Sequence, residues 1–377
     1  MKRYFFDLVV CMCLFGCNNA TKDIGNQYEF DTEIIRWSFN KDFEIKDIVK
    51  NIQFVLLEET PESLFSNIYK LIIKNDRIYI LDISPKSLLV FDINGKFLHK
   101  VGNIGNGPGE YSNSMINFFV NENNEVFLYD YAKRNMMKFD NHGRYINSTK
   151  TSYSLTDFVY LANNQLLLSL DIYEEKNLKR KVMLTDDINK KGIFYFHFHK
   201  DYKHDKLDLA IFQPFENKIA YMRPVNDTLF IFDDKGYLKQ AYFFDFGNRK
   251  LSEDLKNDYE RAIKEIRQGS DKIFIRKTPI IVKNYIFIEM TVGGQNCISV
   301  YDMANNRKSN EFITVDNFSL NNINTPLCAI SDSLLVSYLD PDSYYALIQK
   351  TNFSINNPEA DAYLKDGGTV IILYTIK

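Results

Sequence analysis

The feature that most constrains the fold of this chain is an internal repeat with an offset of 48 residues. Residues 78–98 read IYILDISPKSLLVFDINGKFL, and residues 126–146 read VFLYDYAKRNMMKFDNHGRYI. The matching positions are Asp82 with Asp130, Phe91 with Phe139, Asp92 with Asp140, Gly95 with Gly143, and Phe97 with Tyr145. Periods of about 20–50 residues are typical of solenoids, propellers and other arrays of small units. The chain is therefore expected to form one large repeat domain.

The second half of each repeat predicts a β-hairpin. An apolar strand runs into F-D-x-x-G, where Asp favours a turn and Gly accepts a positive φ, and an aromatic residue leads the returning strand. Further copies are expected around Asp186 and Gly192, at Phe232, Asp233 and Gly236, at Tyr301 and Asp302, and over residues 334–350. The spacing before Tyr301 is longer, because residues 251–269 carry apolar side chains at helical spacing and predict an inserted helix.

Six such units with several short strands each favour a propeller, in which four-stranded sheets repeat radially. A solenoid is the alternative, but it would need capping ends, and neither terminus resembles a cap. Residues 52–59 and 369–377 both read as strands, so one can complete the blade that the other begins. We expect an all-β fold, a six-bladed β-propeller of four-stranded antiparallel blades over residues 47–377, with one inserted helix near residues 251–269.

The N-terminus predicts export and a lipid anchor. Lys2 and Arg3 precede a short apolar stretch that ends in L-F-G-C, which matches a secretory signal with a lipobox. Residues 1–16 are expected to be the signal peptide, Cys17 the lipidated residue, and residues 17–46 a tether at the cell envelope. A plain signal peptide or a buried N-terminal segment is the alternative.

Cysteines and charge narrow the class of protein further. Besides the signal and Cys17, only Cys297 and Cys328 remain, and they form either a disulfide or two free thiols. The formal net charge is −3, without a basic block, which argues against nucleic acid as a partner.

The glycine-rich segment 101–111, VGNIGNGPGEY, raises the question of phosphate binding. A dinucleotide site needs G-x-G-x-x-G opening a helix, and a P-loop needs Gly-Lys-Ser/Thr. Neither occurs here, and the next apolar segment, MINFFV, reads as a strand. The loop is therefore expected to turn the chain from the outer strand of one blade to the inner strand of the next.

The glycine-rich segment and the hairpin before it resemble a known family. The run G-N-G-P-G-E-Y after F-D-x-x-G-x-F resembles the six-bladed β-propeller lipoproteins of Bacteroidetes, which are similar to NHL-repeat and TolB-like propellers. Residues 54–82, the stretch YMRPVNDTLFIFDDKG at 221–236, and Asn357-Pro358 before the terminal strand are similar to the same family. The resemblance implies the propeller fold and attachment to the outer membrane, on its periplasmic or its outer side. It implies no enzymatic activity.

Loops near the blade junctions are the expected place for a ligand, because propeller ligands bind at one mouth of the channel. The candidate ligand-binding residues are Gly107, Glu110, Tyr111, Arg223, Asn226 and Asp227. They would form a polar pocket with an aromatic edge. Alternatively, Glu110 and Tyr111 cap and pack the glycine loop, and Asn226 and Asp227 form an Asx-turn.

Metal binding and cofactors receive less support. His197, His199 and His204 lie within eight residues of one another, and three imidazoles could hold zinc. The lysines around them are instead typical of a solvated loop, so no metal and no cofactor is expected. HExxH, GxSxG and EF-hand motifs do not occur in the sequence.

The sequence thus favours a lipid-anchored propeller of the cell envelope that binds a glycan, a peptide or a protein, without catalysis, as a monomer or within a complex. The alternative is an exported lyase or hydrolase of the NHL-propeller type with its active site at the channel mouth. That enzyme would need His, Arg, Tyr or carboxylate side chains converging on inner strands. A purely structural role would show as a broad exposed apolar patch, and the inserted helix is either a partner contact or a lid.

Overall fold

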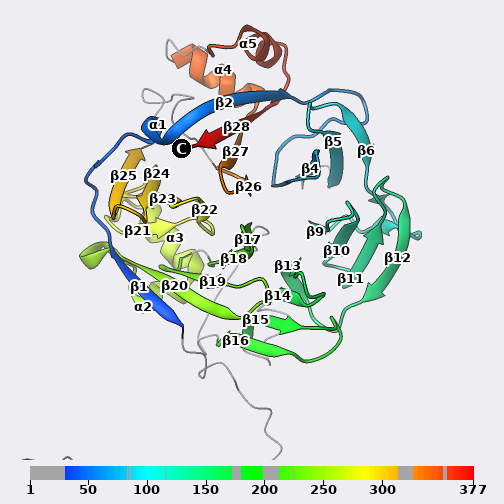
Figure 1. The fold of residues 1–377 in the computed structure, drawn as a ribbon, viewed down its shortest axis with the longest axis horizontal. Helices are drawn as coiled ribbons and strands as arrows, with labels where there is room; N and C mark the ends of the chain where they lie inside the picture. Colours follow the sequence, from blue (N-terminus) through cyan, green and yellow to red (C-terminus); the bar gives the residue numbers. More distant parts are fainter. Residues whose placement is uncertain are drawn as a thin grey trace, which may run out of the picture.

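The computed structural model shows a ring of six β-sheets around a central axis (Figure 1). It describes residues 30–377 except 83, 85, 115, 172–179, 198–211, 224, 313–325 and 351–354. Each sheet is a blade whose strands follow one another from the axis outward, and neighbouring strands are antiparallel except for one added outer strand (Figure 1). The expected six-bladed propeller is confirmed.

The first four blades follow the chain in order. Blade 1 contains β3 (Lys70–Lys74), β4 (Arg77–Asp82), β5 (Ser87–Asp92) and β6 (Phe97–Lys100). Blade 2 contains β9 (Ile116–Val120), β10 (Val126–Asp130), β11 (Asn135–Phe139) and β12 (Tyr145–Lys150). Blade 3 contains β13 (Leu155–Tyr160), β14 (Leu166–Leu170), β15 (Arg180–Thr185) and β16 (Ile193–His197). Blade 4 contains β17 (Phe212–Phe215), β18 (Lys218–Tyr221), β19 (Thr228–Phe232) and β20 (Leu238–Asp245).

The last two blades are less regular. In blade 5, β21 (Ile273–Ile275) and β22 (Ile280–Val282) both pair with β23 (Tyr285–Val292), followed by β24 (Gln295–Asp302) and β25 (Arg307–Phe312). Blade 6 contains β26 (Cys328–Ser331), β27 (Leu334–Leu339), β28 (Val370–Ile376) and β2 (Val49–Leu56). Because β2 pairs antiparallel with the C-terminal β28, the two ends of the domain close the ring within one blade, as the sequence predicts.

The repeated F-D-x-x-G motif forms the hairpin between the third and fourth strands of a blade. In blade 1, Oδ1 of Asp92 accepts hydrogen bonds from the backbone N–H groups of Asn94 and Lys96, each at 2.9 Å. Gly95 takes a φ of +91°. Asp140 and Asp233 make equivalent bonds. Blade 3 shifts the pattern by one residue, because its turn carboxylate is Asp187 rather than the expected Asp186.

The other repeated aspartate fixes the entry into a blade. Asp130 is fully buried at the end of β10, and its two oxygens accept from the backbone N–H and the hydroxyl of Ser112 at 2.6 and 2.7 Å. Asp82, its counterpart in blade 1, binds Ser66 in the same way. A short carboxylate can satisfy both donors of a serine, which explains why both repeats carry Asp here.

Two expectations about helices need correction. The last unit, residues 334–350, is not all strand, because β27 is followed by helices α4 (Pro341–Lys350) and α5 (Pro358–Lys365) before β28. The insertion after β20 forms a short 3₁₀ turn, η2 (Gly247–Arg249), and two helices, α2 (Glu253–Lys256) and α3 (Tyr259–Arg267), rather than one. The break arises because the Asp258 carboxylate accepts from Arg261 N–H at 3.1 Å and caps a new helix.

The chain before residue 47, expected as tether, is partly built into the ring. Strand β1 (Asp31–Arg36) pairs in parallel with β20 and adds a fifth strand to blade 4. The chain then passes along β25 to α1 (Ile45–Ile48) and β2 (Figure 1). Trp37 Nε1 donates to Asn310 Oδ1 at 3.1 Å, and its ring lies 5.9 Å from that of Phe244. This segment joins blades 4, 5 and 6 from the outside.

The blades present two different ends. Since neighbouring strands are antiparallel, the short turns between the first and second strands and between the third and fourth strands lie at one end, here called the short-turn face. The opposite end, the loop face, carries the described connections between second and third strands and between neighbouring blades. They include the glycine loop, the α2–α3 insertion, and helices α4 and α5.

Candidate ligand site on the propeller axis

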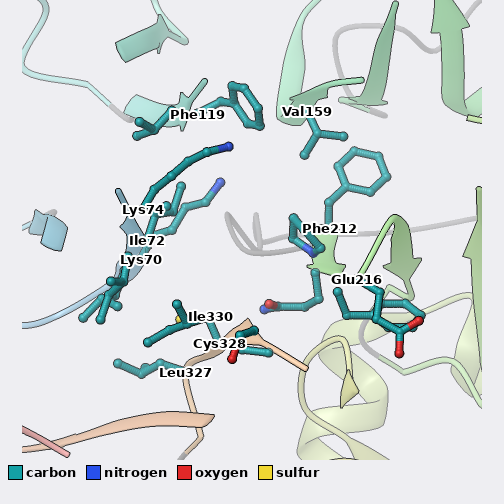
Figure 2. A pocket seen from close by; sticks show the side chains of 18 of the residues that line it. Lys70, Ile72, Lys74, Phe119, Val159, Phe212, Glu216, Leu327, Cys328 and Ile330 are labelled. Carbon is teal, nitrogen blue, oxygen red and sulfur yellow. The ribbon is translucent and has the colours of Figure 1, made fainter. Parts of the chain in front are cut away.

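A cavity of about 370 Å³ lies on the axis between the inner strands of blades 1, 2, 3, 4 and 6 (Figure 2). This volume lies within the range of about 300–1,000 Å³ that is typical of ligand pockets. Its apolar wall consists of Ile72, Phe119, Val159, Phe212, Leu327 and Ile330, and its polar side chains include Lys70, Lys74, Glu122 and Glu216. The cavity is an apolar chamber with charged groups at its ends.

These side chains reach the cavity because side chains alternate between the two sides of each inner strand. Strand β3 reads K-L-I-I-K, and Lys70, Ile72 and Lys74 lie toward the axis in Figure 2. Leu71 and Ile73 lie on the other side of the strand and join the core between blades 1 and 6. Because side chains alternate along a strand, every second residue of an inner strand meets the channel.

At one end of the cavity, Lys70 joins a network of three side chains, Lys70, Asn117 and Asp157, here called the axial network. The fully buried carboxylate of Asp157 accepts from Lys70 Nζ at 3.0 Å and from Asn117 Nδ2 at 2.9 Å. Its second oxygen accepts from the backbone N–H of Phe212 at 2.9 Å. Burial raises the pKa of Asp157, although Lys70 and the Phe212 N–H oppose this shift. The network ties the inner strands of four blades together.

The other end of the cavity lies at the short-turn face and is amphipathic. Lys74 Nζ lies 5.8 Å from the centre of the Phe119 ring and pairs with the Glu122 carboxylate at 2.7 Å. Glu122 is 85% exposed, so this pair lies in solvent and contributes little to stability. Glu216 stands on the opposite side of the mouth in the turn after β17. An apolar group can therefore enter between side chains of both signs.

Cys328 lines the cavity from β26. Burial raises the pKa of its thiol to about 12, although the nearby Lys277 acts in the opposite direction. The thiol is therefore protonated at neutral pH and is a poor nucleophile. Cys328 and Cys297 are both free, which decides between the two alternatives for this pair.

The predicted residues of the glycine loop organise the loop itself. Glu110 Oε2 accepts from the backbone N–H of Gly107 at 2.7 Å, and the Tyr111 hydroxyl donates to the Lys86 carbonyl at 2.9 Å. Lys133 Nζ donates to the carbonyls of Gly105 and Glu110. The short strands β7 (Asn103–Ile104) and β8 (Glu110–Tyr111) pair in parallel. The loop joins β6 to β9, so its predicted part in turning the chain between blades is confirmed.

The second predicted group follows β18. Arg223 is buried and donates to the Leu170 carbonyl at 2.9 Å. The Asn226 side chain accepts from Asp227 N–H at 2.9 Å, and Asp227 pairs with Lys256 Nζ of α2 at 2.7 Å. Arg223 and Asn226 also line a separate cavity of about 240 Å³. Neither predicted group lines the axial cavity, and a ligand-binding role for either group stays a prediction.

The metal prediction falls mostly outside the described residues. His199 and His204 are not among them, and of His197 only the backbone, at the end of β16, is described. Within the described part of the chain, no three His, Cys, Asp or Glu side chains are placed to hold a metal ion. Over the same residues, no helix has the length and apolar character to cross a membrane.

The axial residues Lys70, Asn117 and Asp157 are not among the site residues predicted from the sequence. A usable signal exists in the alternation of polar and apolar residues along inner strands, as in Lys70-x-Ile72-x-Lys74. Asn117-x-Phe119 and Asp157-x-Val159 repeat it in blades 2 and 3. A buried polar residue at alternate positions of an inner strand indicates the channel wall once the strand order is known.

The fold and the axial cavity define this protein as a six-bladed β-propeller. The chain belongs to the family described as "Domain of unknown function (DUF4934)", whose model matches residues 34–366. Its structure is similar to that of a "Putative exported protein" from Bacteroides fragilis, with 18% identity and a TM-score of 0.77 over 92% of this chain and 100% of the other. The expected resemblance to propellers of this bacterial group is confirmed.

Two further solved structures show a lower similarity to this chain. A member of the DUF4221 family from Bacteroides vulgatus has 13% identity and a TM-score of 0.49 over 88% of this chain and 97% of its own. A virginiamycin B lyase from Staphylococcus aureus has 11% identity and a TM-score of 0.43 over 86% of this chain and 99% of its own. No curated protein matches the sequence.

Proposed function

We propose that this protein is an exported binding protein of the cell envelope, held to the membrane through a lipid on Cys17. Its axial cavity takes an apolar side chain of a peptide or of a protein segment. The proposed export and lipid anchor are supported by the signal-like N-terminus with its L-F-G-C sequence. The binding role is supported by one observation above all, the apolar cavity on the axis with charged residues at its mouth.

The chemistry of the wall favours a peptide over a glycan. Sugar hydroxyls need many free donors and acceptors, whereas the wall offers mainly the apolar side chains of Ile72, Phe119 and Phe212. The polar groups of the axial network bind one another, since Asp157 accepts from Lys70, Asn117 and a backbone N–H. An apolar anchor that enters a desolvated pocket, with polar contacts around the rim, is the usual pattern of peptide and protein recognition.

The same contacts favour binding over catalysis. An enzyme of the alternative class would need converging acid–base groups on the inner strands, and Lys70 and Asp157 do converge there. Both Asp157 oxygens, however, already accept hydrogen bonds within the ring. These contacts are those of a carboxylate that joins the inner strands of the ring, which supports a structural role for Asp157.

The proposal can be tested with a variant whose larger side chain fills the cavity. We expect Ile72→Trp to weaken binding of fluorescent octapeptides with a central Phe or Leu by at least about tenfold, a loss of about 1.4 kcal/mol. Peptides with a central Ser should bind weakly to both proteins. The matched control is Ile146→Trp, at a residue on β12 that is 45% exposed. Equal peptide affinity of Ile72→Trp and wild type would overturn the cavity as the site.

Membrane attachment is tested separately. Cys17→Ala should release the protein from the membrane fraction, because it removes the residue that would carry the lipid.

A further inference from the structure

A second hollow lies on the loop face, between α3 and the hairpin of β23 and β24. Its volume is about 700 Å³, larger than that of the axial cavity. The floor is apolar, because it consists of Ile263, which is partly exposed, and of Ile266 and Phe274, which are 3% and 4% exposed. Its rim consists of Glu260, Lys264, Arg267, Arg276, Thr291 and Asn296. We call this hollow the α3 groove.

The charge of the α3 groove is opposite to that of the chain. Its rim carries three cations, Lys264, Arg267 and Arg276, and one carboxylate, Glu260, while the whole chain has a formal net charge of −3. Among the described residues, Lys264 and Arg267 form no ion pair. Arg276 pairs with Glu289 at 2.9 Å, yet its side chain is 41% exposed. The groove thus concentrates positive charge around an apolar floor.

The insertion that forms one wall is firmly placed. Leu255, Ala262 and Ile266 are buried in one cluster with Val225 and Phe274, so the apolar side of the insertion faces the propeller. Lys256 of α2 forms an ion pair with the buried Asp227 at 2.7 Å. Lys264 and Arg267 are three residues apart and therefore lie on one side of α3. The basic side chains project from a fixed helix, which lowers the entropic cost of binding.

The dimensions fit a short extended segment. Helix α3 has nine residues and is thus about 13 Å long, the length of roughly four extended residues. Thr291 and Asn296 add hydrogen-bonding groups on the opposite wall. At the hairpin tip, a Cβ on Gly294 would lie 3.7 Å from the Ile266 carbonyl, so the tip lies close to the end of α3.

From this geometry we propose that the α3 groove binds an acidic segment of a protein partner, with Asp or Glu side chains at Lys264 and Arg267 and an apolar side chain on the floor. This surface is distinct from the axial cavity. It also goes beyond the proposed function, which concerns the cavity alone. Charge complementarity supports an acidic segment, and the apolar floor supports a peptide over a purely phosphate-bearing ligand.

The test uses the mature chain and a fluorescein-labelled peptide of twelve residues, EELDEELDEELD, with its Gln/Asn analogue as the uncharged probe. We expect the acidic peptide to bind, its affinity to fall with rising salt, and Lys264→Glu with Arg267→Glu to weaken it by at least about tenfold. The matched control is Lys50→Glu with Lys96→Glu, which has the same charge change at two exposed lysines elsewhere. Circular dichroism checks that both double variants fold.

Three outcomes would overturn the proposal. The first is the absence of acidic-peptide binding, and the second is an equal loss in both double variants, which would indicate a general charge effect. The third is binding of vesicles with 30% phosphatidylglycerol, but not of the peptide, in a manner that depends on Lys264 and Arg267. Ile72→Trp should leave acidic-peptide binding unchanged, so failure of the cavity and failure of the groove can be told apart.

Discussion

The turns of the short-turn face differ from the connections of the loop face in whether a neighbouring blade packs against them. Each F-D-x-x-G turn packs against the preceding blade. A side chain on Gly95 would meet the Leu56 carbonyl of blade 6 at 2.0 Å, and one on Gly143 would meet the Lys100 carbonyl of blade 1 at 2.6 Å. On the loop face, Gly367 follows α5 and also has a positive φ, yet a side chain there would meet nothing within 4 Å.

This difference explains where the molecule varies. A turn confined by its neighbour must keep both its length and its glycine, so the motif recurs in blades 1, 2 and 4. A connection that faces solvent can lengthen at little cost, and the loop face accordingly holds α2, α3, α4 and α5. The size of a mutational effect should therefore depend on how many blades the residue contacts.

The largest effect is expected at the axis, where four blades meet. Asp157→Ala removes the buried carboxylate and leaves Lys70, whose side chain is 12% exposed, without its ion-pair partner. We expect a loss of about 3–5 kcal/mol in the free energy of unfolding, because breaking a buried ion pair leaves an uncompensated charge. Urea denaturation followed by circular dichroism measures it.

The double variant Lys70→Met with Asp157→Leu sharpens this prediction. It removes both charges and keeps the volume, so most of the lost stability should return. A loss below about 1 kcal/mol in Asp157→Ala would mean that the axial network does not hold the blades together.

An effect of intermediate size is expected at a turn that packs against one neighbouring blade. Gly95→Ala combines a positive φ with a backbone clash, and we expect it to lower the free energy of unfolding by about 3 kcal/mol. Gly367→Ala has the positive φ without the clash and should cost about 1 kcal/mol. Equal losses in the two variants would show that φ alone, rather than the neighbouring blade, requires glycine in the repeat.

The smallest effect is expected at the partly exposed turn carboxylate of blade 2. Hydrogen bonds from the backbone N–H of Arg144 lower the pKa of Asp140 to about 2. Because the folded-state pKa lies below the ordinary value of 3.8, the ionised carboxylate stabilises the fold above about pH 4, and this contribution disappears as the pH falls through 2. Asp140→Asn should therefore lower the urea midpoint slightly at pH 7 and hardly at pH 2. A difference that persists unchanged at pH 2 would contradict the assigned cause.

Much of the fold could be predicted because its signals are local. The turn at Asp92 and Gly95 is encoded in five residues and recurs, so the repeat and its hairpins follow from the sequence alone. The helix break at Asp258 is also local, but a continuous apolar spacing on both sides hides it. The strand β1 was missed because its pairing partner, β20, lies about 200 residues away.

The sequence by itself determined the strands, the turns and the number of blades, because periodicity and turn chemistry act over a few residues. Only the tertiary structure decided which side chains meet on the axis. Lys70 and Asp157 are 87 residues apart, and Asn117 lies between them at separations of 47 and 40. Each belongs to a different blade, and the polar–apolar alternation that they share does not say that the three side chains meet. They meet only because closing the ring through β2 and β28 brings the inner strands together around one channel.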